Sequence, residues 1–125
     1  MTTGHCLCGA CAFAFDGPAN WQAYCHCESC RHATAAPVAA YIAAPAGSWR
    51  WTGAAPKVYE SSPGQRWHFC PTCGSHLAYD SDRYPEEIHF MAALVDDPSG
   101  IAMAAHAHAE ERLPWLTMHD GLPRE

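Results

Sequence analysis

The stretch Cys25-His26-Cys27-Glu28-Ser29-Cys30 places three thiols within six residues of a 125-residue chain. An ordinary hydrophobic core does not need cysteine at this density, and a disulfide would use two of these thiols and leave one over. Three cysteine thiolates on one zinc ion leave a fourth position open, which distinguishes a site that can do chemistry from one that only holds a fold. We therefore predict that Cys25, Cys27 and Cys30 are metal ligands.

Two further cysteine pairs lie in opposite halves of the chain, and each is followed by glycine. They are Cys6-Leu7-Cys8-Gly9 and Cys70-Pro71-Thr72-Cys73-Gly74. Glycine allows the tight turn in which backbone amides point toward the sulfurs. Two such pairs make a closed four-thiolate site, whose role is structural. We predict that Cys6, Cys8, Cys70 and Cys73 form this site, and a different division of the same thiols is the alternative.

The eighth cysteine, Cys11, shares one face of an alternating segment with Phe13 and Phe15. Buried cysteine is a common small apolar residue, so we predict that Cys11 belongs to the core. If Cys11 instead completed the Cys25–Cys30 group, that group would be a closed site and the case for chemistry would mostly fall.

The chain has nine histidines, and three of them bear on the metal sites. His26 should point away from a metal ion if both flanking sulfurs bind it. His106 and His108 are the candidates for a fourth ligand of the second ion or for a proton carrier, because imidazole titrates near neutral pH.

Nine glycines and ten prolines recur along the chain rather than clustering, and helical periodicity is weak. This pattern predicts many short strands and turns. The length predicts one zinc-binding domain over residues 1–125. We predict an all-β fold of several small twisted sheets around metal knuckles, with strands at residues 10–15, 38–42, 49–52, 57–61, 76–79 and 88–94.

The charge pattern argues against two classes of partner. The formal net charge is -6, and the seven basic residues are scattered with no run or stripe. Both features argue against a general nucleic-acid binder or an anionic-membrane binder. The first residues lack the pattern of a secretory signal, and the longest apolar segment is too short to span a bilayer. We expect a cytoplasmic protein, and cysteines in such a reducing compartment are more typically metal ligands than disulfides.

The motifs follow a specific order: Gly4-x-Cys6-x-Cys8-Gly9, Cys25-His26-Cys27-x-x-Cys30-Arg31 and Phe69-Cys70-x-x-Cys73-Gly74-Ser75. This order resembles the glutathione-dependent formaldehyde-activating enzyme family, which includes the centromere protein V-like domains. The likeness extends through Trp51-Thr52-Gly53, Tyr59-x-Ser61-Ser62-Pro63-Gly64 and the tail from His106 to Pro123. The sequence departs from the family pattern at Cys11, where an aliphatic residue is expected, and at Ala35, near a position that is often glycine.

The resemblance implies an Mss4-like fold of small coiled antiparallel sheets and two zinc ions per chain. The family's structural zinc corresponds to Cys6, Cys8, Cys70 and Cys73, and its catalytic zinc corresponds to Cys25, Cys27 and Cys30. The implied activity is that of a carbon–sulfur lyase, which condenses formaldehyde with glutathione to give S-hydroxymethylglutathione. The implied partners are therefore a small-molecule thiol and an aldehyde.

Ligand chemistry agrees with that activity. A free thiol is only a few per cent thiolate at neutral pH, and the open position of a zinc ion would deprotonate it. Three thiolate ligands make zinc a weak Lewis acid but keep a bound sulfur nucleophilic, which favours thiol activation over hydrolysis. His106 is a candidate to protonate the alkoxide, and Arg31 either meets a substrate carboxylate or is a solvated side chain.

Two other functions compete with this one. The first is a non-catalytic two-zinc binding module for a protein partner, which would have a protein side chain as the fourth ligand of the second zinc. The second is a redox enzyme with a cysteine nucleophile. That enzyme needs a metal-free cysteine in an exposed setting, and only Cys11 is free, on an apolar face. The sequence leaves the oligomeric state and the identity of the thiol and aldehyde open.

Overall fold

The computed structural model describes residues 1–125 and contains two β-sheets and one α-helix. The smaller sheet has the strand order β1-β2-β5, and the larger sheet has the order β10-β3-β4-β9-β8-β7-β6. The predicted all-β, Mss4-like architecture is confirmed. No helix in the structure has both the length and the apolar surface needed to cross a bilayer.

The strands are short, with two to seven residues each. The smaller sheet contains β1 (Thr2–His5), β2 (Ala12–Phe15) and β5 (Trp49–Trp51). The larger sheet contains β3 (Trp21–Cys25), β4 (Ala39–Pro45), β6 (Lys57–Ser62), β7 (Gln65–Phe69), β8 (His76–Ser81), β9 (Glu87–Met91) and β10 (His106–Ala107). The helices are α1 (Glu28–Thr34) and the 3₁₀ turns η1 (Ala92–Leu94), η2 (Pro98–Gly100) and η3 (Ala109–Glu111).

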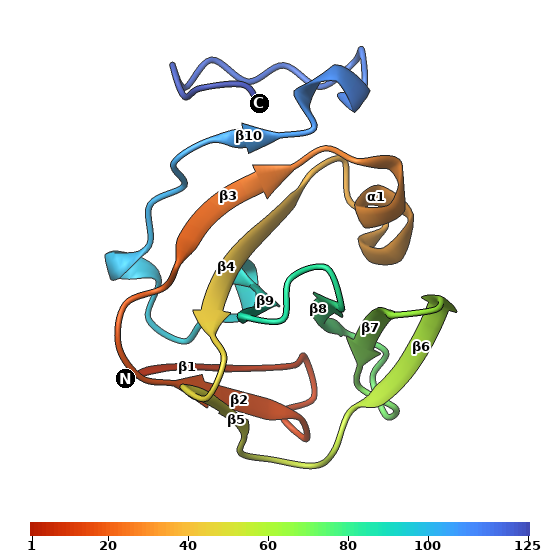
Figure 1. Cartoon of the computed structure of the whole chain (residues 1–125), viewed down its shortest axis with the longest axis vertical. Helices are drawn as coiled ribbons and strands as arrows, with labels where there is room; N and C mark the ends of the chain where they lie inside the picture. Colours follow the sequence, from red (N-terminus) through yellow and green to blue (C-terminus); the bar gives the residue numbers. More distant parts are fainter.

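The strands pair antiparallel as predicted, with one exception. β10 pairs with β3 in parallel, through His106 opposite Tyr24 and Ala107 opposite Cys25. Figure 1 shows β10 beside β3 at the end of the sheet where α1 lies, far from the small sheet of β1, β2 and β5. The C-terminal segment is therefore held against the strand that ends in Cys25.

The core lies where the two sheets face each other. Phe13 stacks on Phe90 with ring centroids 4.1 Å apart, and both side chains are fully buried. Phe15 stacks on the same ring at 6.2 Å, so strand β2 presents the alternating aromatic face that the sequence predicted. Stacked aromatic pairs contribute on the order of 1 kcal/mol beyond their buried area, which fixes one sheet on the other.

The opposite face of the larger sheet carries a row of aligned side chains. Residues directly opposite in an antiparallel pair point to the same face of the sheet. The strand registers align six residues in this way across six strands: Tyr59, Trp67, Tyr79, His89, Ala43 and Trp21. This row is mostly aromatic, and four of its members, Trp67, Tyr79, His89 and Trp21, line the cavity described next.

Candidate metal centres and the cavity beside them

The three-thiol group lies where β3 ends and α1 begins. The side-chain sulfurs of Cys25, Cys27 and Cys30 lie within 4.8 Å of one another. Cys27 is the N-cap residue of α1, and its Sγ accepts a hydrogen bond from the backbone N–H of Cys30 at 3.3 Å. A cap of this kind satisfies a free helix amide and fixes the two sulfurs on one side of the turn. The short helix therefore assembles the group that the sequence predicted.

The sulfurs of this group compete for protons. Hydrogen bonds from the sulfurs of Cys25 and Cys30 lower the pKa of Cys27, whereas hydrogen bonds to its neighbours and burial raise the pKa of Cys30. The hydroxyl of the buried Tyr41 donates to Cys30 Sγ at 3.3 Å. Three thiolates at this spacing need a cation to be ionised together, so the donor set fits a metal ion that prefers sulfur ligands.

The four-thiol group joins two distant parts of the chain. Cys6, Cys8, Cys70 and Cys73 place their sulfurs within 4.8 Å of one another. Cys8 Sγ lies 3.6 Å from Cys6 Sγ and 3.8 Å from Cys70 Sγ. This set has the number and type of ligands of a closed, tetrahedral zinc site.

Backbone amides surround these sulfurs, as in a knuckle that holds thiolates. Cys70 Sγ accepts from the N–H groups of Thr72 and Cys73, each at 3.4 Å. Hydrogen bonds from Ser75 lower the pKa of Cys73 to about 5. Gly74 has a φ of +78°, which glycine adopts without steric cost, and its N–H closes the turn onto the Cys70 carbonyl at 2.9 Å.

Cys11 is a core residue, as predicted. Its side chain is fully buried in the cluster that contains Phe13 and Phe15, beside Cys6 and Cys70. Burial raises the pKa of its thiol to about 11. Cys11 is therefore packed next to the four-thiol group and does not complete the three-thiol group.

The histidine candidates are placed differently from one another. The His26 ring turns to His106, as expected for a residue between two ligands, and the two rings are fully buried. Both ring nitrogens of His106 have partners, His26 and Asp120, so it is not directed at the sulfurs. His108 lines the cavity beside the three-thiol group. Arg31 donates from Nε to the His26 carbonyl at 3.3 Å.

A cavity of about 710 Å³ opens beside the three-thiol group. Its volume is in the range of small-molecule sites. None of the four cysteines of the other group lines it. The lining combines the three sulfurs with aromatic side chains and a few polar groups: Trp21, Tyr24, Tyr41, Trp67, Tyr79, Tyr84, Gln65, Arg83, Glu86, Glu87, His89 and His108.

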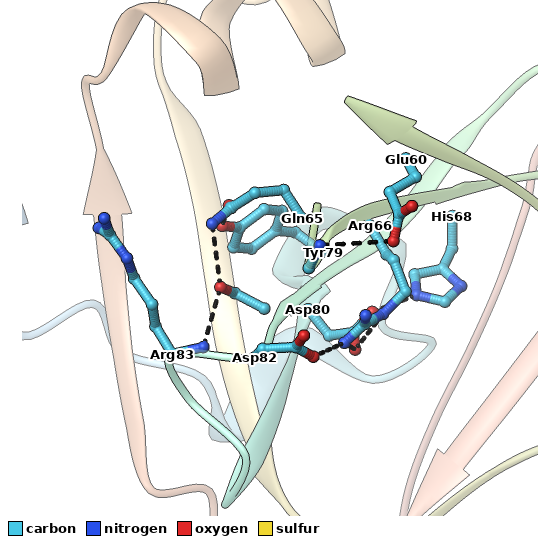
Figure 2. A network of polar contacts seen from close by, with 10 residues as sticks. Glu60, Gln65, Arg66, His68, Tyr79, Asp80, Asp82 and Arg83 are labelled. Carbon is cyan, nitrogen blue, oxygen red and sulfur yellow. Dashed lines mark hydrogen bonds and ion pairs between the residues drawn. The ribbon is translucent and has the colours of Figure 1, made fainter. Parts of the chain in front are cut away.

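A polar network braces β7 and β8, which form part of the cavity wall. Figure 2 shows Arg66 between Asp80 and Asp82, with Nη2···O distances of 2.8 and 2.9 Å, and His68 Nε2 2.6 Å from Asp80. These partners hold the pKa of Asp80 below its usual value although burial opposes them. The Arg83 side chain extends away from this network and has no ion-pair partner.

The sequence did not single out the cavity-facing residues of the central strands. Tyr41, Trp67, Tyr79 and His89 come from four different strands, and each looks like an ordinary strand residue when its own segment is considered alone. The signal available in the sequence was the alternation of side chains between the two faces of each strand. This alternation places residues from different strands on a shared face only when the strand order is known.

Comparison with known proteins agrees with this arrangement. Residues 1–111 match the glutathione-dependent formaldehyde-activating enzyme family. The crystal structure of a Rhodobacter sphaeroides protein is similar with a TM-score of 0.66 and 20% identity, covering 98% of this chain and 99% of that chain, which shows a shared fold. No curated protein matches the sequence. Because the family match spans both cysteine groups and every strand of the two sheets, the chain belongs to the glutathione-dependent formaldehyde-activating enzyme family.

Proposed function

We propose that the protein is a zinc-dependent carbon–sulfur lyase, which activates glutathione or a similar thiol for addition to formaldehyde or another small aldehyde. The product with glutathione and formaldehyde is S-hydroxymethylglutathione. One observation carries the proposal: the three-thiol group opens onto the 710 Å³ cavity, whereas the four-thiol group does not line it. A site with three protein ligands and adjoining space is typical of catalytic zinc.

The two cysteine groups would hold two zinc ions per chain with different roles. Cys6, Cys8, Cys70 and Cys73 would hold a structural ion. Cys25, Cys27 and Cys30 would hold the catalytic ion, which when bound supplies an acceptor for the substrate sulfur and favours its thiolate form. Tyr41 donates its hydroxyl to Cys30 Sγ, so it fixes that ligand and withdraws some charge from it.

The cavity walls suit a small organic thiol. The aromatic side chains of Trp67, Tyr79 and Trp21 supply apolar surface that excludes water from the reacting sulfur. Arg83 lies at the rim with its guanidinium unpaired, which suits a substrate carboxylate. Arg31 contacts the His26 carbonyl and lines a different, smaller cavity, so we assign the carboxylate contact to Arg83.

The proposal includes a cytoplasmic location and small-molecule partners only. Seven of the eight cysteines gather in two groups that could each hold a metal ion, and this use of cysteine is typical of a reducing compartment. The dispersed basic residues and the net charge of -6 support the absence of a nucleic-acid or membrane partner.

A combined metal and rate measurement tests the function. Metal analysis should give two zinc ions per chain in the wild type and one in Cys27→Ala. The rate of hydroxymethyl exchange between a thiol and ¹³C-formaldehyde, followed by NMR above the uncatalysed background, should rise with wild-type protein and return to background with Cys27→Ala. His119→Gln, an exposed residue outside the cavity, is the matched control. Two bound zinc ions without acceleration for any thiol would support the non-catalytic binding module instead.

A further inference from the structure

His89 and Glu87 form a buried pair on the wall of the cavity. His89 Nε2 lies 2.6 Å from Glu87 Oε2, and the two side chains are only 9% and 7% exposed. The same carboxylate also accepts hydrogen bonds from Trp21 Nε1 at 2.8 Å and Asn20 Nδ2 at 3.1 Å. Three donors therefore hold Glu87 as a fixed carboxylate, and its position is set before any substrate enters.

The second ring nitrogen of His89 is free. Nδ1 makes no hydrogen bond, and it is not among the side-chain atoms sealed from solvent without a partner. Because His89 lines the cavity, this nitrogen is open to a molecule within it. An ionised carboxylate can only accept, so Glu87 fixes the Nε2–H tautomer and leaves the lone pair on Nδ1.

Aromatic rings keep the His89 side chain in place. Its ring centroid lies 4.6 Å from that of Trp21, 5.6 Å from Tyr84, 5.8 Å from Tyr79 and 6.0 Å from Tyr41. Trp21 can approach this closely because the residue between them in the strand register is the small Ala43. The imidazole is thus oriented by packing on several sides and by one carboxylate.

The charge environment suits a neutral resting imidazole. Burial lowers the pKa of His89, while Glu87, Asp80 and Glu86 oppose this effect. Near neutral pH the ring therefore has a vacant Nδ1 and can accept a proton. A base whose pKa lies near or just below the working pH can both take a proton and return it.

The pair is connected to the three-thiol group by one residue. Tyr41 contacts His89 through its ring, and its hydroxyl lies 3.3 Å from Cys30 Sγ. His89 and the three sulfurs line the same cavity, so a substrate between them can reach both. Other buried histidines do not share this geometry, since His26 and His106 are paired with each other.

We propose that His89 is the general acid–base residue of the reaction and that Glu87 is its positioning residue. This role rests on the proposed function. His89 Nδ1 takes the proton that the substrate thiol loses. The sulfur then forms a bond to the aldehyde carbon, and the electron pair of the C=O π bond moves to oxygen. The imidazolium returns its proton to that oxygen, so the thiol and aldehyde give the hydroxyalkyl thioether with no other reactant.

Kinetics of His89→Gln test the catalytic role. We expect the exchange rate at saturating thiol to fall by about 100-fold or more, the range of general acid–base catalysis, with KM for the thiol changed little. The wild-type rate should decline on the acid side as Nδ1 becomes protonated, and this decline should vanish in the variant. Metal content is measured at each pH to separate this effect from ligand loss. Imidazole added to His89→Ala should restore part of the rate.

A measurement without turnover tests the tautomer. In ¹⁵N-labelled protein, long-range ¹H–¹⁵N NMR spectra should show His89 as the Nε2–H tautomer at neutral pH, and Glu87→Gln should change this population and lower the rate. A neutral ring with hydrogen on Nδ1 would overturn the proposal, even if the variants fold poorly.

The two proposals fail in different ways. If wild-type protein accelerates the exchange but His89→Gln retains the same rate and pH profile, the role of His89 is wrong and the function stands. If wild-type protein accelerates no thiol, the function is wrong and this role for His89 is wrong with it.

Discussion

His26 Nε2 lies 2.8 Å from His106 Nδ1, and His106 Nε2 lies 2.8 Å from Asp120 Oδ2. Because the Asp120 carboxylate can only accept, His106 donates to it from Nε2 and accepts from His26 at Nδ1. The chain of hydrogen bonds connects the residue between two cysteines of the three-thiol group to a segment about 80 residues away. The parallel strand β10 places His106 at this point.

We predict that Asp120→Asn and His106→Ala lower stability to different degrees. His106→Ala leaves His26 Nε2 unpaired and opens a cavity, so we expect a loss of about 2–4 kcal/mol. Asp120→Asn keeps the shape and changes a partly exposed side chain, so it should cost clearly less than His106→Ala. Urea unfolding measures both, with His119→Asn as the exposed control. An unfolding midpoint for His106→Ala equal to that of the control would show that the buried pair contributes nothing.

Tyr41→Phe should weaken the second metal site without unfolding the protein. The change removes only the hydroxyl that donates to Cys30 Sγ at 3.3 Å. Hydrogen bonds to ligands typically change metal affinity 10- to 100-fold, so we expect zinc affinity of the three-thiol group to fall about 10-fold. Competition with a chromophoric chelator measures the change. Tyr59→Phe, on the exposed strand β6, should leave the zinc affinities of the three-thiol and four-thiol groups unchanged.

Cysteine substitutions should fall into three classes. Cys70→Ala should lose one zinc ion and most of the stability, because structural zinc contributes several kcal/mol to folding. Cys27→Ala should lose one zinc ion with a much smaller stability loss. Cys11→Ala should lose about 1–2 kcal/mol by removing a buried thiol and keep both ions. Thermal unfolding and metal analysis separate the classes, and loss of zinc from Cys11→Ala would contradict its assignment to the core.

Stability should fall as the pH decreases from about 6.5 to 4 because of His76. Its Nε2 is buried without a partner, and burial lowers the pKa of the ring to about 4. Between those values the unfolded chain binds a proton that the folded protein does not, so stability increases with pH there. The contribution is at most about 3 kcal/mol. Urea unfolding of His76→Gln should show a weaker pH dependence than the wild type, and equal slopes would contradict this account.

Ala35→Gly should stabilise the protein. Ala35 ends helix α1 with a φ of 55°, in the left-handed region that disfavours residues with a side chain. Removing the methyl group relieves about 1 kcal/mol, and the greater freedom of glycine in the unfolded chain offsets part of it. We expect a net gain of about 0.5 kcal/mol in urea unfolding. Ala36→Gly, whose φ is not positive, should instead lose stability.

The sequence predicted the elements with strong local patterns. The strands now seen as β2, β4, β5, β6 and β8 were each predicted from a short segment of apolar, aromatic or alternating residues bounded by turns. Strands β1, β3, β7 and β10 were not predicted. The residues of β3 are half-exposed and mixed in polarity, and the two residues of β10 carry no pattern. The expected strand at 88–94 stops at Met91, where the chain turns into the 3₁₀ turn η1.

The candidate site also has a part that could be predicted from the sequence and a part that could not. The cysteine groups could be found because their spacing is local and chemically specific, and the structure brings together both sets as divided from the sequence. The cavity could not be found, because His89, Tyr79 and Trp21 meet only through the register of several strands. Among nine histidines, the sequence favoured His106 and His108, while the free nitrogen on the cavity wall belongs to His89.

The two cysteine groups differ in how far apart their members lie along the chain. Cys25, Cys27 and Cys30 are neighbours, so their sulfurs remain near one another even when the chain is unfolded. Cys8 and Cys70 are 62 residues apart and meet only when a long loop closes. A metal ion that binds folded and unfolded chains alike does not shift the folding equilibrium. Zinc in solution should therefore act on folding mainly through the four-thiol group, while the three-thiol group can capture zinc before the fold exists.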